Sequence, residues 1–199
     1  YVPDNKINKR VLVKLDFSEK SILNHISEQF MEMRKPWKKV KTKEAHSKSD
    51  ALKIMVNTFY GANTNPYISY GDMSVGVVIT AIARWLILSA VEVIRNKHGK
   101  ESVVYVHTDG INTNCAIDIE WLTKRLRIIL KHKIPEASEQ WINMDKDVYK
   151  EGFWLQIGNY VLRNLDGSLT THGSTFKSRS RSIFYLKTLN KIINARLDN

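Results

Sequence analysis

Three polar side chains fall on one face of a predicted helix in the first third of the chain. Lys53, Asn57 and Tyr60 stand at positions i, i+4 and i+7, which brings an ammonium, an amide and a phenol to the same side. Further along, Asp109 stands at the tip of a predicted β-hairpin and is followed by Gly110. Cationic and hydrogen-bonding groups that hold a polyphosphate, next to a carboxylate that holds Mg²⁺, are the minimum parts for phosphoryl transfer.

An amphipathic helix with a solvated polar face is the alternative explanation of the first group, and periodicity alone favours it. Residue choice favours the chemical explanation, because a solvated face rarely needs Tyr60 beside Gly61 at its C-terminal end, where a small residue lets a flat ligand approach. The same helix carries a separate apolar stripe that is predicted to face the core, formed by Leu52, Met55, Val56 and Phe59.

Length, charge and cysteine usage narrow the class of protein. The 199 residues allow one domain or two small lobes, and a hydrophobic fraction of 43% suffices for a packed interior. A formal charge of +11 indicates a polyanionic partner, nucleic acid before an anionic membrane surface, although a ribosome-associated or merely soluble basic protein has the same balance. The single cysteine, Cys115, excludes an intrachain disulfide and fits a reducing compartment.

The start of the sequence carries no cationic segment followed by an apolar one, so we do not expect secretion. We expect the cytoplasm or nucleoid, or the replication site of a viral or plasmid host. The apolar stretch Val75–Ile94 is long enough to suggest a membrane span, but Arg84 at its middle would cost about 2.5–3.5 kcal/mol on insertion. A long buried helix is therefore predicted there, and no membrane partner.

Helices account for most of the residues in the predicted elements. The first is expected to begin after Ser18 as its N-cap and to end at Pro36, and the second to begin near Ser49 and run to Gly61. Ala62–Pro66 reads as a loop. Further helices are predicted over residues 69–97, 117–132 and 182–197.

Strands are predicted mainly in the second half of the chain. The hairpin strands span residues 103–106 and 111–116, joined across Asp109-Gly110. A tight turn is expected at Asp166-Gly167. The other expected strands cover residues 11–15, 141–144, 151–157 and 159–165. Helices and antiparallel strands in this order indicate the α+β class.

The ordered set of motifs resembles the fingers and palm of family B DNA polymerases, especially the archaeal and viral branch. Lys-x₃-Asn-x₂-Tyr-Gly, from Lys53 to Gly61, is followed by Tyr-x-x-Thr-Asp-Gly, from Tyr105 to Gly110. The similarity covers nearly the whole chain. It includes Ser21-Ile-Leu-Asn-His-Ile-Ser-Glu as the first fingers helix, and Val148-Tyr-Lys-Glu-Gly-Phe-Trp, Asn159-Tyr160-Val and Leu165-Asp-Gly-Ser-Leu-Thr-Thr-His-Gly173 as strands leading from palm to thumb.

The resemblance implies a role for each motif residue. Lys53 would neutralise the phosphates of the incoming nucleotide, Asn57 would position the triphosphate, and Tyr60 would pack against the nascent base pair. Arg34 matches a basic position that reaches the triphosphate. Asp109 matches the palm carboxylate that ligates both Mg²⁺ ions, and hard Mg²⁺ does prefer such oxygen ligands.

Two further features concern the DNA. Tyr160 would sit near the primer strand, by resemblance. The stretch from Arg34 to Lys43 holds six basic residues in ten positions around Trp37, which favours phosphate contact over an ordinary solvated turn. The candidate phosphate-binding residues are Lys38, Lys39 and Lys41.

The chain departs from the family at three places. The first of two palm aspartates is His107, and a neutral imidazole is a poor Mg²⁺ ligand. The lysines that normally precede Tyr160 are replaced by Gln156-Ile157-Gly158-Asn159. The upstream segment that supplies the second carboxylate is missing, and Asp16 is interpreted as a helix-start residue in preference to a ligand, since no Leu-Tyr-Pro follows it.

The resemblance therefore implies a lead-in over residues 1–17, fingers helices over 18–61, a palm over 62–147, and palm-to-thumb strands with a C-terminal helix over 148–199. The expected partners are a primer–template, a deoxynucleotide and a larger polymerase subunit that carries the exonuclease and the first palm motif. Its carboxylate would complete a site for two Mg²⁺ ions. Two alternatives stay open: a catalytically degenerate subunit that binds DNA or stabilises a replicase, and a fragment of a longer polymerase.

Overall fold

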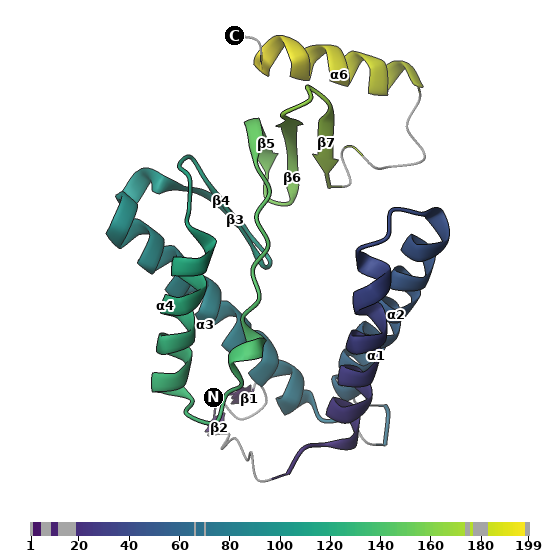
Figure 1. Ribbon diagram of the computed structural model, residues 1–199, viewed down its shortest axis with the longest axis vertical. Helices are drawn as coiled ribbons and strands as arrows, with labels where there is room; N and C mark the ends of the chain where they lie inside the picture. Colours follow the sequence, from purple (N-terminus) through teal and green to yellow (C-terminus); the bar gives the residue numbers. More distant parts are fainter. Residues whose placement is uncertain are drawn as a thin grey trace. The chain divides into compact units, whose positions relative to one another are not determined.

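The computed structural model describes residues 2–4, 9–11, 19–65, 67–69, 71–173, 176 and 183–197 (Figure 1). The chain divides into two compact units. The first comprises Tyr1–Leu88 with Ile134–Glu136, and the second comprises Ser89–Lys133 with Ala137–Asn199. One long helix, α3 (Met73–His98), belongs to both. Helices combine with small antiparallel sheets, consistent with the expected α+β class.

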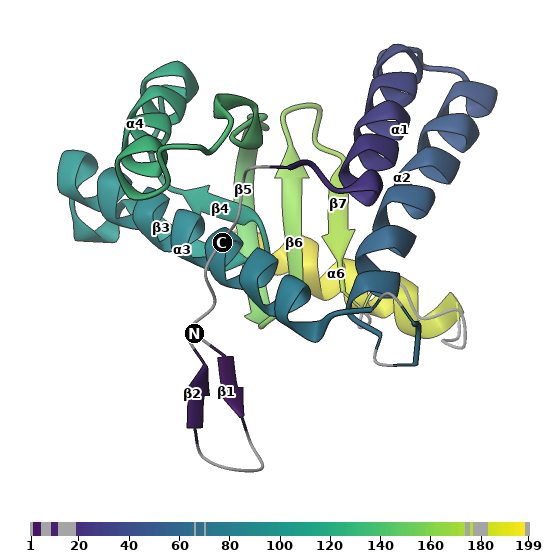
Figure 2. The ribbon, with the colours of Figure 1, turned by 90° about the horizontal axis from the view of Figure 1, so that it is seen from below.

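The first unit contains a short hairpin and a pair of helices. Strand β1 (Val2–Asp4) pairs antiparallel with β2 (Lys9–Val11), and the residues that follow, including the candidate helix start Asp16-Phe17-Ser18, lie outside the described residues. Helices α1 (Ile22–Lys38) and α2 (Lys43–Asn63) lie side by side (Figures 1 and 2). Phe30 of α1 stacks on Phe59 of α2 with ring centroids 5.8 Å apart.

Both helices begin at other residues than the sequence predicted, because other side chains cap them. The hydroxyl of Ser21 accepts from the backbone N–H of Asn24 at 3.2 Å and starts α1, so the prediction of Ser18 as the cap is wrong. The hydroxyl of Thr42 likewise accepts from the Ala45 N–H and caps α2. This helix therefore begins at Lys43, six residues before the predicted start at Ser49. Neither hydroxyl stands out in sequence from its polar neighbours.

Pro36 does not end α1, which continues to Lys38. A proline lacks one helical N–H and crowds the carbonyl four residues earlier. In the last turn of a helix the disruption affects only the end of the hydrogen-bond ladder, and the chain then turns at Lys39. The predicted helix end at this proline is therefore wrong by two residues.

Helix α3 starts where the carboxylate of Asp72 accepts from the N–H of Ser74 at 2.8 Å, and stops before Gly99, which has a φ of +97°. Burial along α3 is uneven. In its most apolar stretch 17% of the residues are buried, and Ala90, Val91 and Ile94 belong to the second unit's core. The prediction of a long buried helix is therefore wrong over most of its length. Among the described residues, it is the one helix long and apolar enough to cross a membrane.

The second unit contains the expected hairpin, with a turn one residue earlier than predicted. Strands β3 (Val103–His107) and β4 (Gly110–Thr113) are antiparallel, and His107 pairs with Gly110. The loop is therefore Thr108-Asp109, and Thr108 takes the positive φ of +55° that a two-residue hairpin turn requires. Asp109 lies at the hairpin tip, as expected.

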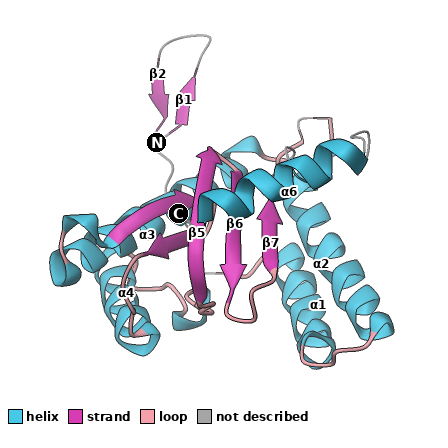
Figure 3. Cartoon of the chain, turned by 90° about the horizontal axis from the view of Figure 1, so that it is seen from above, coloured by secondary structure: helices cyan, strands magenta, loops and turns pink. Residues whose placement is uncertain are grey.

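Three more strands form an antiparallel sheet in the order β5 (Tyr149–Gln156), β6 (Asn159–Asn164) and β7 (Leu169–His172). The predicted turn between β6 and β7 is confirmed: Gly167 has a φ of +83°, and the Asp166 carboxylate accepts from Ser168. Helix α6 (Ile183–Leu197) runs across this sheet (Figures 2 and 3). Its Ile193 is buried, as is Val161 of β6.

Helix α4 (Ile119–Lys133) follows the hairpin in the sequence and precedes the three-stranded sheet. It buries a stripe at every fourth residue, formed by Leu122, Leu126 and Leu130. The strand predicted over residues 141–144 is absent: a short 3₁₀ helix, η2 (Glu139–Trp141), stands at its start. The carbonyl of Ile142 accepts from the Arg127 guanidinium at 3.2 Å in place of a neighbouring strand. A second 3₁₀ turn, η1 (Lys100–Ser102), precedes β3.

Candidate functional site

The hairpin that carries Asp109 has two different faces. Tyr105 and His107 project from β3 on the same side, with nearly parallel rings 6.2 Å apart. Val104 and Val106, on the other side, are exposed. Asp109 itself is exposed, so its carboxylate is accessible to an ion or ligand.

The rings of the hairpin pack on a row of rings from the three-stranded sheet. Trp154, Tyr160 and His172 are paired across β5, β6 and β7, so their side chains lie on one face. Tyr160 and His172 stack in parallel, with centroids 4.8 Å apart. The ring centroids of Tyr105 and Tyr160 are 5.7 Å apart, and those of His107 and His172 are also 5.7 Å apart. We name this group the ring cluster; its members are Tyr105, His107, Trp154, Tyr160 and His172.

Polar contacts with the β5–β6 turn hold two members of the ring cluster, Tyr105 and His172, in place. The phenol oxygen of Tyr105 accepts from the backbone N–H of Gly158 at 2.7 Å, and the Gly158 carbonyl lies 3.3 Å from Nδ1 of His172. Gly158 has a φ of +76°, and a Cβ there would lie 3.3 Å from Nε2 of His107. A glycine is therefore favoured at this turn, both by its positive φ and because a Cβ would make the His107 imidazole shift slightly.

Electrostatics link Tyr160 to the hairpin tip. Burial raises the pKa of Tyr160 above its ordinary value, and the neighbouring Tyr105 phenol and the Asp109 carboxylate raise it further. Asp109 and Tyr160, which the sequence predicted as a metal ligand and a primer-side residue, are thus brought together in one unit. Sequence reasoning missed Gly158 and His172, although a glycine within the Gln156–Asn159 departure was a signal that a tight turn replaces the expected lysines.

The donor set at the hairpin tip fits part of a site for a hard divalent cation. An exposed carboxylate is a suitable Mg²⁺ ligand, whereas His107 is engaged in the ring cluster. Within the part of the chain that the structure describes, no three His, Cys, Asp or Glu side chains gather around one point.

The predicted nucleotide-binding residues of α2 lie in the first unit. Lys53 and Asn57 are exposed, and Tyr60 is 40% exposed. The Tyr60 oxygen lies 3.9 Å from the position of a Cβ at Gly76, in the first turn of α3. Gly61 faces open space, as expected for a place where a flat ligand could approach.

The apolar stripe of α2 is less buried than predicted. Leu52, Val56 and Phe59 are half-buried, and Met55 is 46% exposed, so its predicted core position is wrong. Among the elements that the structure describes, α1 is the one that packs closely against α2, and one neighbouring helix covers a narrower stripe than a full core does.

Arg34 takes a position that the sequence did not indicate. Its Nε donates to both the carbonyl and the hydroxyl of Ser49, each at 3.1 Å, and Ser49 is buried in the contact between α1 and α2. Arg34 therefore holds the two helices together, whatever its other guanidinium nitrogens do. The candidate phosphate-binding lysines lie exposed at the turn between these helices and are Lys38, Lys39 and Lys41.

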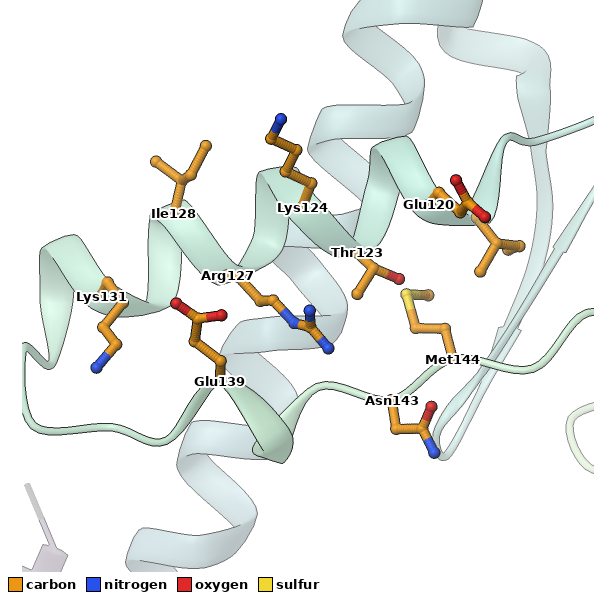
Figure 4. Close-up of a pocket in the computed structure, with 10 residues that line it drawn as sticks. Glu120, Thr123, Lys124, Arg127, Ile128, Lys131, Glu139, Asn143 and Met144 are labelled. Atoms are coloured by element: carbon orange, nitrogen blue, oxygen red, sulfur yellow. The ribbon is translucent and has the colours of Figure 1, made fainter.

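A hollow of about 720 Å³ lies along α4 and was not predicted (Figure 4). Lys124, Arg127 and Lys131 recur at helical spacing along one side, and Glu139 and Met144 lie on the segment opposite. The spacing was visible in the sequence, but the segment that closes the hollow was predicted as a strand.

A region of this chain is similar to a DNA polymerase. Over 148 residues the chain is 25% identical to the DNA polymerase of Thermococcus sp. (strain 9oN-7), a match that covers 74% of this chain and 19% of that polymerase. No family model matches the chain. The chain thus spans about a fifth of the length of the relative it matches, and contains a DNA polymerase-like region.

Proposed function

We propose that this chain forms part of the catalytic region of a family B DNA polymerase, which adds deoxynucleotides to a primer 3′ end on a DNA template. The observation that carries the proposal is the exposed Asp109 carboxylate at a hairpin tip beside Tyr160. The similarity to an archaeal DNA polymerase across most of the chain supports it independently.

Each residue acts through its own chemistry. Asp109 would hold Mg²⁺ through carboxylate oxygens, while Lys53 and Arg34 would neutralise the triphosphate and Asn57 would orient it by hydrogen bonding. Tyr60 packs on the nascent base pair beside Gly61. Two bound Mg²⁺ ions would supply Lewis-acid activation of the phosphoryl group and of the attacking hydroxyl.

Residues that contact the DNA are proposed in each unit separately. Tyr160 contacts the primer strand from the ring cluster. Cationic contacts to phosphates come from Lys38, Lys39 and Lys41. In this proposal residues 18–61 are the fingers, 62–147 the palm, and 148–199 lead to the thumb.

Asp109 does not complete a two-metal site alone, because His107 occupies the position of the first palm aspartate and its ring packs on Tyr160 and His172. We therefore propose a larger partner polypeptide that supplies the second carboxylate, the exonuclease and the rest of the palm. A chain that spans about a fifth of its relative fits a split polymerase and a fragment of a longer one equally well.

Primer extension tests the proposal. The chain is assayed alone and with the polypeptide encoded beside it, on a labelled primer–template with deoxynucleotides and Mg²⁺. Nucleotide addition by the pair, lost in Asp109→Asn while the two proteins still co-purify, is the expected result. Unchanged extension by Asp109→Asn would remove this carboxylate from the mechanism.

A second candidate function is a non-catalytic subunit that binds DNA or stabilises a replicase. The specific observation in its favour is His107, a poor Mg²⁺ ligand that is already engaged in the ring cluster. Extension by the partner polypeptide alone, unaffected by this chain's Asp109→Asn variant, would favour this function.

A further inference from the structure

The turn between α1 and α2 concentrates positive charge around an indole. We name residues 34–43 the basic tip; it has six basic side chains and no acidic one. The basic residues are Arg34, Lys35, Lys38, Lys39, Lys41 and Lys43. The whole tip lies within the first unit.

Two acidic side chains flank the tip in sequence, and each is paired with a lysine: Glu32 with Lys35 of the tip, and Glu44 with Lys48 outside it. Glu32 contacts Lys35 at 2.5 Å, and Glu44 contacts Lys48 at 2.6 Å. The hydrogen bond and the charge of Lys48 lower the pKa of Glu44, which keeps that carboxylate ionised and bound to its lysine. Glu32 therefore compensates Lys35 of the tip, whereas Glu44 is held by a lysine outside it.

Three lysines of the tip are open to a ligand. Lys39, Lys41 and Lys43 are exposed, and no acidic side chain of the described residues forms an ion pair with any of them. Mobile ammonium groups of this kind bind phosphate oxygens without requiring one fixed geometry.

Trp37 lies among these lysines and remains 36% exposed. The ammonium of Lys48 lies 4.4 Å from the ring centroid, so α2 supports the indole through a cation–π contact. Val40, on the turn, is also exposed, at 44%. A supported, part-exposed indole beside free ammonium groups is the combination with which proteins bind unpaired strands, stacking a base and neutralising its phosphates.

We propose that the basic tip binds single-stranded nucleic acid, with a base stacked on Trp37 and backbone phosphates on Lys39, Lys41 and Lys43. In the polymerase proposed above, on which this assignment of the ligand rests, the strand is the unpaired template. A duplex fits less well, because its bases are already stacked on one another and leave no open face for the indole.

Fluorescence anisotropy with a labelled thymidine oligonucleotide of about 12 nucleotides tests the proposal. We expect Trp37→Ala to weaken binding on the order of tenfold, and Trp37→Phe, which keeps a flat ring, to retain most of the affinity. Changing Lys39 and Lys41 to Gln together should reduce the slope of log affinity against log salt by about 1.4, roughly 0.7 for each lysine.

Trp141→Ala is the matched control, because Trp141 is 48% exposed and lies in the second unit. Circular dichroism of each variant checks that α1 and α2 remain folded. Lys48→Met combined with Glu44→Gln, which removes the cation beside the indole together with the carboxylate paired to it, gives a second comparison if Trp37→Ala unfolds. The proposal is overturned if Trp37→Ala and Trp141→Ala bind alike, if a duplex of the same length binds as tightly, or if the tip variants reduce binding only to anionic phospholipid vesicles.

The same measurements separate this proposal from the polymerase function. Asp109→Asn should bind the oligonucleotide as the unaltered chain does, because the proposed contacts all come from residues 34–43. Oligonucleotide binding that depends on Trp37, without any primer extension by the assembled pair, would support the tip and contradict the catalytic role.

Discussion

The phenol oxygen of Tyr105 accepts a hydrogen bond of 2.7 Å from the backbone N–H of Gly158, 53 residues later in the chain. This bond joins the hairpin that carries Asp109 to the β5–β6 turn, next to Tyr160. The hairpin has only two strands, and such a pair is marginally stable by itself. The contacts with the three-stranded sheet therefore set how the Asp109 tip is held.

Tyr105→Phe should destabilise the protein by about 1–3 kcal/mol, because the part-buried N–H of Gly158 loses its acceptor while the ring still fills its place. Urea unfolding measures the change. Tyr67→Phe is the control, since Tyr67 is 95% exposed, and its effect should stay within about 0.5 kcal/mol. Equal stabilities of the two variants would mean that the bond does not contribute.

Gly158→Ala and Gly167→Ala form a matched pair at positive φ, +76° and +83°. A Cβ at Gly167 meets open space, so that variant reports backbone strain alone, about 1–2 kcal/mol. A Cβ at Gly158 lies 3.3 Å from the His107 ring and should cost roughly 1 kcal/mol more. Thermal unfolding compares the two, and a smaller loss at Gly158 would contradict the packing of His107 on this turn.

Tyr160 should ionise late in an alkaline titration. Its raised pKa means that the folded state favours the neutral phenol, so its contribution to stability is present below the ordinary value of 10.0 and is lost as pH rises through the folded-state pKa. Asp109→Asn removes one cause of the shift, and the Tyr160 transition should move to lower pH. Tyrosinate absorbance follows it.

Tyr160→Phe identifies the transition by removing it from the titration. If Asp109→Asn leaves that transition in place, the Asp109 carboxylate is too far from the phenol to influence it, and the geometry of the candidate site is wrong.

Arg34→Lys should destabilise the α1–α2 pair by about 1 kcal/mol, because the ammonium nitrogen lies one bond further from Cδ than Nε does and must shift to reach the carbonyl and hydroxyl of Ser49. Positive charge is retained, so any loss of stability is separate from a role in triphosphate binding. Ser49→Ala, which removes the hydroxyl alone, should cost less. Helical circular dichroism during urea unfolding measures both, and additive effects in the double variant would show that the two residues do not interact.

Local patterns in the sequence were sufficient for much of the secondary structure. The hairpin tip at Asp109, the turn at Gly167 and the helix through Lys53 follow from turn chemistry and helical spacing, which act over a few residues. The resemblance of the ordered motifs to a polymerase agrees with the similarity to an archaeal DNA polymerase.

The exact start and end of the first helix could not be predicted from the sequence, because neighbouring residues can serve as a cap or a stop. Ser18 was predicted as the first helix cap, and only the backbone geometry shows that Ser21, three residues later, accepts the Asn24 N–H. Pro36 was expected to end a helix that in fact continues for two more residues. Its penalty depends on its distance from the helix end, which is itself set by the packing of α1 on α2.

What the sequence by itself determined is which side chains are present and which of them share a face of one helix or strand. Only tertiary structure decided that His107 and Tyr105 pack on Tyr160 and His172, and that Arg34 bonds Ser49 between two helices. The physical reason is range: a spacing along the chain acts within one element, whereas ring packing and hydrogen bonds between residues far apart in sequence exist only once separate elements have docked.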